Sequence, residues 1–132
     1  MKILNLTQHV ATFEQRKQGV EEPSESTKKE IKKLLTFDIL PSSQEMQLRA
    51  QYLIEIAQKN NYNKILVGGA PFFCKYIDFA AFEKGITVVY AFSKRESVDT
   101  KLEDGSVRKT MVFKHLGFIE AEIFVPFSML GD

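Results

Sequence analysis

The stretch KILVGGAP, residues 64–71, predicts a buried strand, a glycine turn and the start of a helix. Its first part, 64–67, is short and almost continuously apolar, which is typical of a strand buried within a parallel sheet. The two glycines allow a tight turn and a close approach of the backbone to a ligand. Pro71 suits the first helical position, where its missing N–H is not needed. A strand that leads directly into a helix indicates an α/β fold.

The flanking sequence continues this alternation of strands and helices. Capping-box spacing at 27–30 and at 42–45 marks two helix starts. The further elements expected from the pattern are a strand at 2–6, a helical turn at 12–18, a helix from 71 to about 84 and a strand at 86–92. This order predicts one α/β domain over residues 1–132, with a mainly parallel sheet, right-handed crossovers and helices on both faces.

The C-terminal third predicts an antiparallel β-hairpin. Asp104-Gly105 between two β-prone runs is a strong hairpin signal, and the return strand is expected at about 107–118. A two-residue turn would create three opposed pairs: Glu103 with Ser106, Lys94 with His115, and Arg95 with Lys114. Like charges directly opposite are mildly destabilising, and an anion between them would relieve the repulsion. The hairpin therefore hints at a ligand that carries phosphate or carboxylate.

The composition narrows the functional class. The chain has 132 residues, 44% hydrophobic and 27% charged, with a net charge of +1. This near-neutral balance argues against a general binder of duplex nucleic acid. The lone cysteine cannot form an internal disulfide, and no apolar run reaches membrane-spanning length, so a cytoplasmic protein without a membrane partner is expected. The two histidines and the cysteine show no metal-ligand spacing, and no metal or cofactor is expected.

Three segments should meet at one edge of the sheet. Ligands of open α/β sheets bind beyond the carboxyl ends of the parallel strands. The segments that follow those ends are Thr7-Gln8-His9, Gly68-Gly69-Ala70 and Ser93-Lys94-Arg95. The glycine segment opens a helix, whose N-terminus favours an anion. A purely structural turn explains the glycines equally well.

Each candidate side chain also has a plain structural interpretation. His9 suits general acid–base chemistry or a hydrogen-bonded loop position. His115 shares a strand face with Met111 and Phe113, so a semi-buried structural role is favoured over catalysis. Lys94 and Arg95 suit phosphate. An ordinary surface ion-pair cluster, in which Glu96 neutralises both cations, is an equally good interpretation.

Other reactive or charged residues fit structural roles. Cys74 falls beside two phenylalanines on an expected helix and is interpreted as a buried structural thiol. The lysine pairs at 28–29 and 32–33 are interpreted as a solvated helix face.

Three stretches resemble a known family. They are His9-x-x-Thr12-x-Glu14-Gln15, the strand and glycine turn at 65–69, and Lys94-Arg95-Glu96 followed by Asp104-Gly105-Ser106-Val107, Lys109-Thr110, Val112-Phe113 and His115. The last is the most specific. On these residues the chain resembles small, single-domain CRISPR-associated proteins of the Csx type, which are related to the CARF fold and are considered ring nucleases.

The resemblance implies a Rossmann-like, CARF-like fold of three layers. It also implies a homodimer that binds a cyclic oligoadenylate messenger of type III CRISPR antiviral signalling in a cleft across its two-fold axis. Metal-independent attack by a ribose 2′-hydroxyl would then open the ring and leave 2′,3′-cyclic phosphate ends. The roles implied are catalytic for His9, Lys94 and Arg95, and ligand-binding for Thr7, Gln8, Gly68, Gly69, Ala70, Ser93, Glu96 and His115.

Two alternatives to a ring nuclease stay open. The same fold suits a module that binds or sequesters a nucleotide messenger without cleaving it. The Phe-rich segment at 123–127 suits an interaction protein, with a phage or mobile-element role, that uses this segment as an interface.

Overall fold

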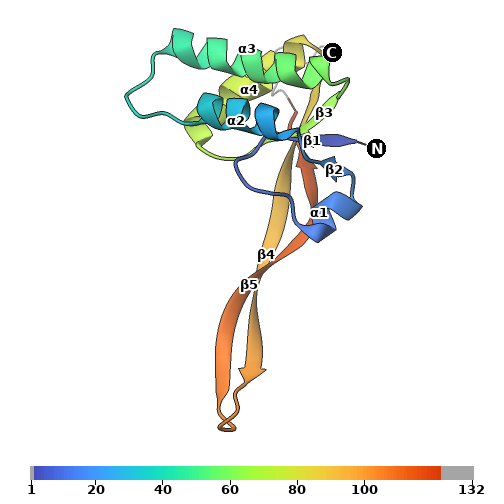
Figure 1. Ribbon diagram of the computed structural model, residues 1–132, viewed down its shortest axis with the longest axis vertical. Coiled ribbons are helices and arrows are strands. Elements are labelled where there is room, and N and C mark those ends of the chain that lie inside the picture. The colour runs from blue at the N-terminus through green and yellow to red at the C-terminus, as the bar shows by residue number, and fades with distance from the viewer. Residues whose placement is uncertain (1, 123–132) are drawn as a thin grey trace, which may run out of the picture.

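The computed structural model describes residues 2–122 and shows a body of sheet and helices from which one long hairpin projects (Figure 1). The elements in chain order are β1 (Ile3–Asn5), α1 (Phe13–Lys17), β2 (Val20–Glu21), α2 (Glu25–Leu35), α3 (Ser43–Lys59), β3 (Lys64–Leu66), α4 (Pro71–Glu83), β4 (Thr87–Lys101) and β5 (Val107–Glu120). The Phe-rich segment at 123–127 lies outside the described residues.

The sheet has the strand order β2-β1-β3-β4-β5. Its first four strands are parallel and β5 is antiparallel to β4, so the expected mainly parallel α/β sheet with an antiparallel hairpin is confirmed. The chain leaves β1 toward one edge and leaves β3 toward the other, which makes the gap between β1 and β3 a topological switch point. With right-handed crossovers, this change of direction places α1 on one face and the later helices on the other.

The two faces of the sheet are covered unequally. The main core joins α2, α3 and α4 to the side chains of Leu4, Ile65 and Val88. A smaller cluster on the other face contains Ile3, Ala11, Val20, Leu66 and Val89, and α1 adds no buried residue to it. Helices were expected on both faces, but the second helical layer consists of the short α1 alone.

Local signals explain where the helices begin and end. The Ser42 hydroxyl accepts a hydrogen bond from the Glu45 N–H at the start of α3, as the capping-box spacing predicts. Pro71 is the first residue of α4. The expected start of α2 at Thr27 is wrong, because Ser24 is the N-cap and accepts from the Thr27 N–H. An earlier acceptor with suitable backbone angles lengthens the helix by one turn.

The hairpin has a different register from the expected one. Phe92 faces Gly117 but Ser93 faces His115, so Leu116 is an extra residue in a β-bulge. The expected opposed pairs are therefore wrong throughout the outer hairpin. The pairs observed are Lys94 with Lys114, Arg95 with Phe113, and Lys101 with Val107 as the last before the turn.

The turn itself spans residues 102–106 rather than two residues. Gly105 has a positive φ of 85°, and the Asp104 carboxylate accepts from the Ser106 N–H at 2.9 Å. We call residues 93–115 the arm. It extends well beyond the body, from the edge of the sheet where the parallel strands end (Figure 1).

Candidate functional site

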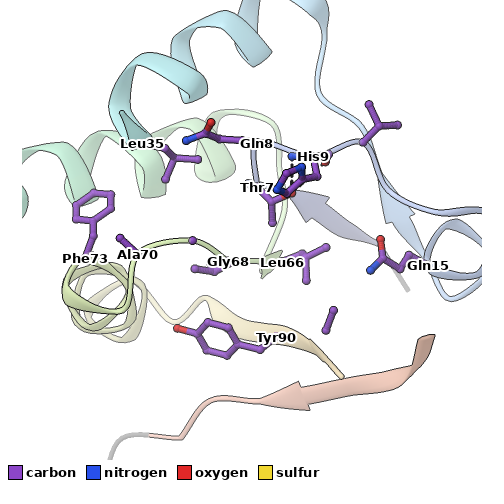
Figure 2. A pocket seen from close by; sticks show the side chains of 14 residues that line it. Thr7, Gln8, His9, Gln15, Leu35, Leu66, Gly68, Ala70, Phe73 and Tyr90 are labelled. Carbon is purple, nitrogen blue, oxygen red and sulfur yellow. Dashed lines mark hydrogen bonds between the residues drawn. The ribbon is translucent and has the colours of Figure 1, made fainter. Parts of the chain in front are cut away.

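A cleft of about 470 Å³ opens at the carboxyl ends of β1 and β3, beside the part of β4 that holds Tyr90 and Ala91 (Figure 2). Its walls are the segments 7–10 and 66–70, with Tyr90 and Ala91 from β4 and with Gln15, Leu35 and Phe73 at the margins. The cleft therefore lies at the switch point, where ligands of open α/β sheets bind. Its volume falls in the range of small-molecule sites.

The buried Asn5 shapes the first wall. Its side chain is 2% exposed and makes hydrogen bonds from both ends. The amide nitrogen donates to the His9 carbonyl at 2.8 Å and to Glu22 Oε2 at 2.7 Å, while Oδ1 accepts from the Thr7 N–H and hydroxyl. Because the Thr7 hydroxyl is engaged with Asn5 and His9, Thr7 supports the loop and leaves Gln8 and His9 as the exposed polar side chains.

Glu22 completes this support from β2's side of the sheet. Its Oε2 also accepts from the Ala11 N–H at 3.1 Å, and Lys28 lies 3.3 Å from Oε1. Burial raises the pKa of Glu22, but the hydrogen bonds from Asn5, Ala11 and Lys28 outweigh it and hold the pKa below its ordinary value. The loop at 7–10 is thus fixed by a charged network.

The second wall is the turn between β3 and α4. Gly69 has a φ of 110°, a conformation that side chains rarely adopt. Gly68 lies against Thr7, and a Cβ added at Gly68 would lie 3.5 Å from the Thr7 methyl carbon. Ala70 is the N-cap of the 13-residue α4 and offers no side-chain cap. The cleft therefore contains a bare helix N-terminus, whose dipole favours negative charge.

Tyr90 joins the cleft to a small polar cluster between β4 and α4. The Tyr90 hydroxyl donates to Asp78 Oδ1 at 3.1 Å. Burial raises the pKa of Asp78 and also that of the half-buried Cys74 thiol. A thiol that stays protonated is a poor nucleophile, so the cluster ties α4 to β4 rather than supplying a reactive group.

A smaller hollow of about 150 Å³ lies on the other side of the loop at 7–10 and shares Gln8 and His9 with the main cleft. Lys28, Lys29 and Lys32 line it from α2. The expected solvated helix face is confirmed, since Lys29 and Lys32 are exposed, and the structure places it beside the cleft loop. The sequence does contain a signal for this basic cluster, because residues four apart, such as 28 and 32, share a helix face.

The arm holds the second group of expected site residues. Ser93, Lys94, Arg95, Glu96 and His115 do not line the cleft. None of the ion pairs found within residues 2–122 joins Glu96 to Lys94 or Arg95. The structure brings together Thr7, Gln8, His9, Gly68, Gly69 and Ala70, and it leaves the basic hairpin residues on the projecting arm.

The arm residues have other partners. His115 contacts Gln18 through Nε2 at 2.9 Å and packs on the Phe118 ring. Arg95 stacks on the Phe113 ring, with 5.3 Å from the guanidinium carbon to the ring centre. The expected semi-buried position of His115 is confirmed. The expected burial of the rest of its strand face is wrong, because Met111 is 55% and Phe113 70% exposed.

Between residues 2 and 122, no three His, Cys, Asp or Glu side chains gather closely enough to hold a metal ion together. No helix in that range combines the length and apolarity needed to cross a membrane.

Among known proteins, the chain matches one family profile. No curated protein and no solved structure matches the chain. A family profile matches residues 1–119, which is most of the chain and includes the whole cleft and the arm. The chain therefore belongs to the family described as "Uncharacterized protein MJ1673 family".

Proposed function

We propose that the cleft binds a nucleotide through its phosphate, and that the ligand is a cyclic oligoadenylate messenger. One observation carries the proposal: the cleft at the switch point combines the Gly68-Gly69 turn with the uncapped N-terminus of α4. Backbone N–H groups and the helix dipole favour a phosphate there. The family resemblance of the sequence supports an oligoadenylate, and with it a cytoplasmic protein.

The cleft suits one nucleotide unit of such a ligand. Its apolar margin of Val10, Leu35 and Phe73 offers a surface for a base, and Gln8 offers a hydrogen-bonding amide. Lys28, Lys29 and Lys32 would attract the neighbouring phosphates from across the loop. The cleft volume of about 470 Å³ suits one such unit, so we expect one bound unit per chain, whether or not two copies associate as the resemblance implies.

Cleavage, in this proposal, needs a proton acceptor at the cleft. The ribose 2′-oxygen would bond to the adjacent phosphorus as the bond to the 5′-oxygen breaks, leaving a 2′,3′-cyclic phosphate. His9 would take the proton of the 2′-hydroxyl, and the departing 5′-oxygen would gain a proton from water or from the resulting imidazolium. Lys94 and Arg95 do not line this cleft, so the stabilisation of phosphoryl charge is assigned to the α4 N-terminus and the α2 lysines.

A binding protein without turnover is the second candidate. It is favoured by the scarcity of reactive groups: the cleft walls contain His9 and Tyr90 as titratable side chains, and Tyr90 is engaged with Asp78. Such a protein would sense or sequester the messenger.

The test is incubation of stoichiometric protein with cyclic tetra-adenylate in EDTA, followed by chromatography and calorimetry. We expect linear products that end in 2′,3′-cyclic phosphate, and at least a tenfold loss of rate in His9→Ala. Lys109→Ala, on the distant arm, is the control and should keep the rate. Tight binding with an intact ring would support the second candidate. Neither binding nor turnover, for this or the six-membered ring, would overturn the nucleotide proposal and favour an interaction protein.

A further inference from the structure

The arm lacks the cover that a β-ribbon normally needs. Nine cross-strand pairs, from Ser93–His115 to Lys101–Val107, extend beyond the sheet. Val98, Val107, Met111, Val112 and Phe113 are between 38% and 70% exposed, and they lie on both sides of the ribbon. A two-stranded hairpin is marginally stable by itself in water, so an arm of this length calls for a partner surface.

One side of the arm has a symmetric arrangement of charge. Side chains alternate between the two faces of a ribbon, and we call one of them the Arg95 face. It consists of Ser93, Arg95, Ser97, Asp99 and Lys101 from β4 and of the residues opposite them, His115, Phe113, Met111, Lys109 and Val107. Ser97 and Met111 form its central pair. Arg95 and Asp99 lie at equal distances along the strand on either side of Ser97.

We propose that a second copy of this chain packs its own Arg95 face on this one, with the arms antiparallel and the two-fold axis at the Ser97–Met111 pair. A two-fold interface is self-complementary, so each contact occurs twice. Arg95 then meets Asp99 of the second copy. Phe113 meets Lys109 of the second copy, which places a cation over an exposed aromatic ring.

The ends of the arm are complementary as well. The turn at the tip carries Glu103 and Asp104, between the cations Lys101 and Arg108. At the base, α1 carries Glu14 in its first turn and Arg16 and Lys17 in its last turn. The contact between His115 and Gln18 fixes α1 at the base of the Arg95 face. A two-fold axis at the middle of the arm brings the acidic tip of each copy to the basic α1 of the other.

The opposite face of the arm is a poorer surface for a second copy. There Lys94 lies directly across from Lys114, so packing on this face would bury two adjacent like charges. The arrangement also keeps the two clefts at opposite ends of the paired arms, so each chain would bind its own ligand rather than share one across the axis.

The test measures the mass of the full chain by sedimentation at several concentrations without any ligand. We expect a dimer, and a dissociation constant raised about tenfold or more by Arg95→Asp or by Asp99→Arg, because each places like charges together. The double exchange, R95D with D99R, should restore the dimer. Glu96→Lys, on the opposite face, is the control and should leave it unchanged. A monomer at all concentrations would overturn the proposal.

A cross-linking experiment identifies the face without relying on a charge reversal. In a Cys74→Ser background, Ser97→Cys should be joined efficiently to its counterpart by a short bis-maleimide, because the axis passes beside it. Glu96→Cys should not be joined. Equal cross-linking of both variants, or selective cross-linking at residue 96, would overturn the proposed interface. Since no nucleotide is present, these outcomes are separate from those that test the cleft.

Discussion

The two halves of strand β4 differ in burial and in their neighbours. At Val88 it pairs with β3 under the main helical core, and the side chain is 3% exposed. At Val98 it has β5 as its neighbour, and the side chain is 42% exposed. The same residue type on the same strand face is therefore core in one place and surface in the other. Burial, rather than β-propensity, decides which half of the strand holds the fold together.

The largest predicted effect contrasts these two valines. Val88→Ala removes two methyl-sized groups from a packed core and should lower the free energy of unfolding by about 2–3 kcal/mol, from lost burial and the cavity left behind. Val98→Ala removes the same atoms from the exposed arm, on the side away from the proposed interface, and should cost about 0.5 kcal/mol or less. Urea unfolding of both variants measures the difference. Equal losses would show that the arm folds as part of the body.

The next prediction concerns the buried support of the cleft. Asn5→Ala deletes the hydrogen bonds that hold the loop at 7–10 and should cost about 2 kcal/mol, because the Thr7 N–H and the His9 carbonyl lose their partner. It should also raise the pKa of Glu22, which loses a hydrogen bond to its charged form. Chemical denaturation and an NMR titration of the Glu22 carboxyl check the two effects. An unchanged pKa would mean that Lys28 and Ala11 alone hold it down.

The sign of the Glu22 effect follows from linkage. Its pKa in the folded protein lies below the ordinary value of 4.5, so the charged carboxylate stabilises the fold fully above that pH. The contribution declines as the pH falls through the folded pKa. The stability difference between the natural chain and Glu22→Gln should therefore be constant near neutrality and shrink in acid.

Much of the body could be predicted from the sequence, because its signals are local. Ser42 and Pro71 mark helix starts by capping chemistry, and the apolar run at 64–67 marks a buried strand. The two-residue strand β2 could not be found, since Val20–Glu21 is too short for any periodicity and exists because it pairs with β1. The arm register depends on a bulge at Leu116, which no local pattern marks.

The candidate site was predictable where it follows strand ends and not where it depends on packing. The segments 7–9 and 68–70 meet because parallel strands end at one edge. Ser93-Lys94-Arg95 obeys the same rule in the sequence, but β4 continues past the edge and carries those residues onto the arm. Tyr90 and the α2 lysines enter the site through tertiary packing, which a single sequence does not reveal.

The smallest predicted effect compares two glycines with positive φ, Gly69 in the cleft wall and Gly105 at the arm tip. An added Cβ meets no atom within 4 Å at either position, so substitution by alanine costs backbone strain alone, about 1–2 kcal/mol locally. Gly69→Ala strains a turn between two core elements and should lower global stability by that amount and weaken ligand binding. Gly105→Ala should increase amide hydrogen exchange in the arm and leave the unfolding midpoint of the body unchanged.

Gly68→Ala is the control for the cleft, because its φ is not positive and its new methyl would make an ordinary contact with Thr7 at 3.5 Å. If Gly105→Ala destabilised the body as much as Gly69→Ala, the arm and the body would form one cooperative unit and the contrast along β4 would fail.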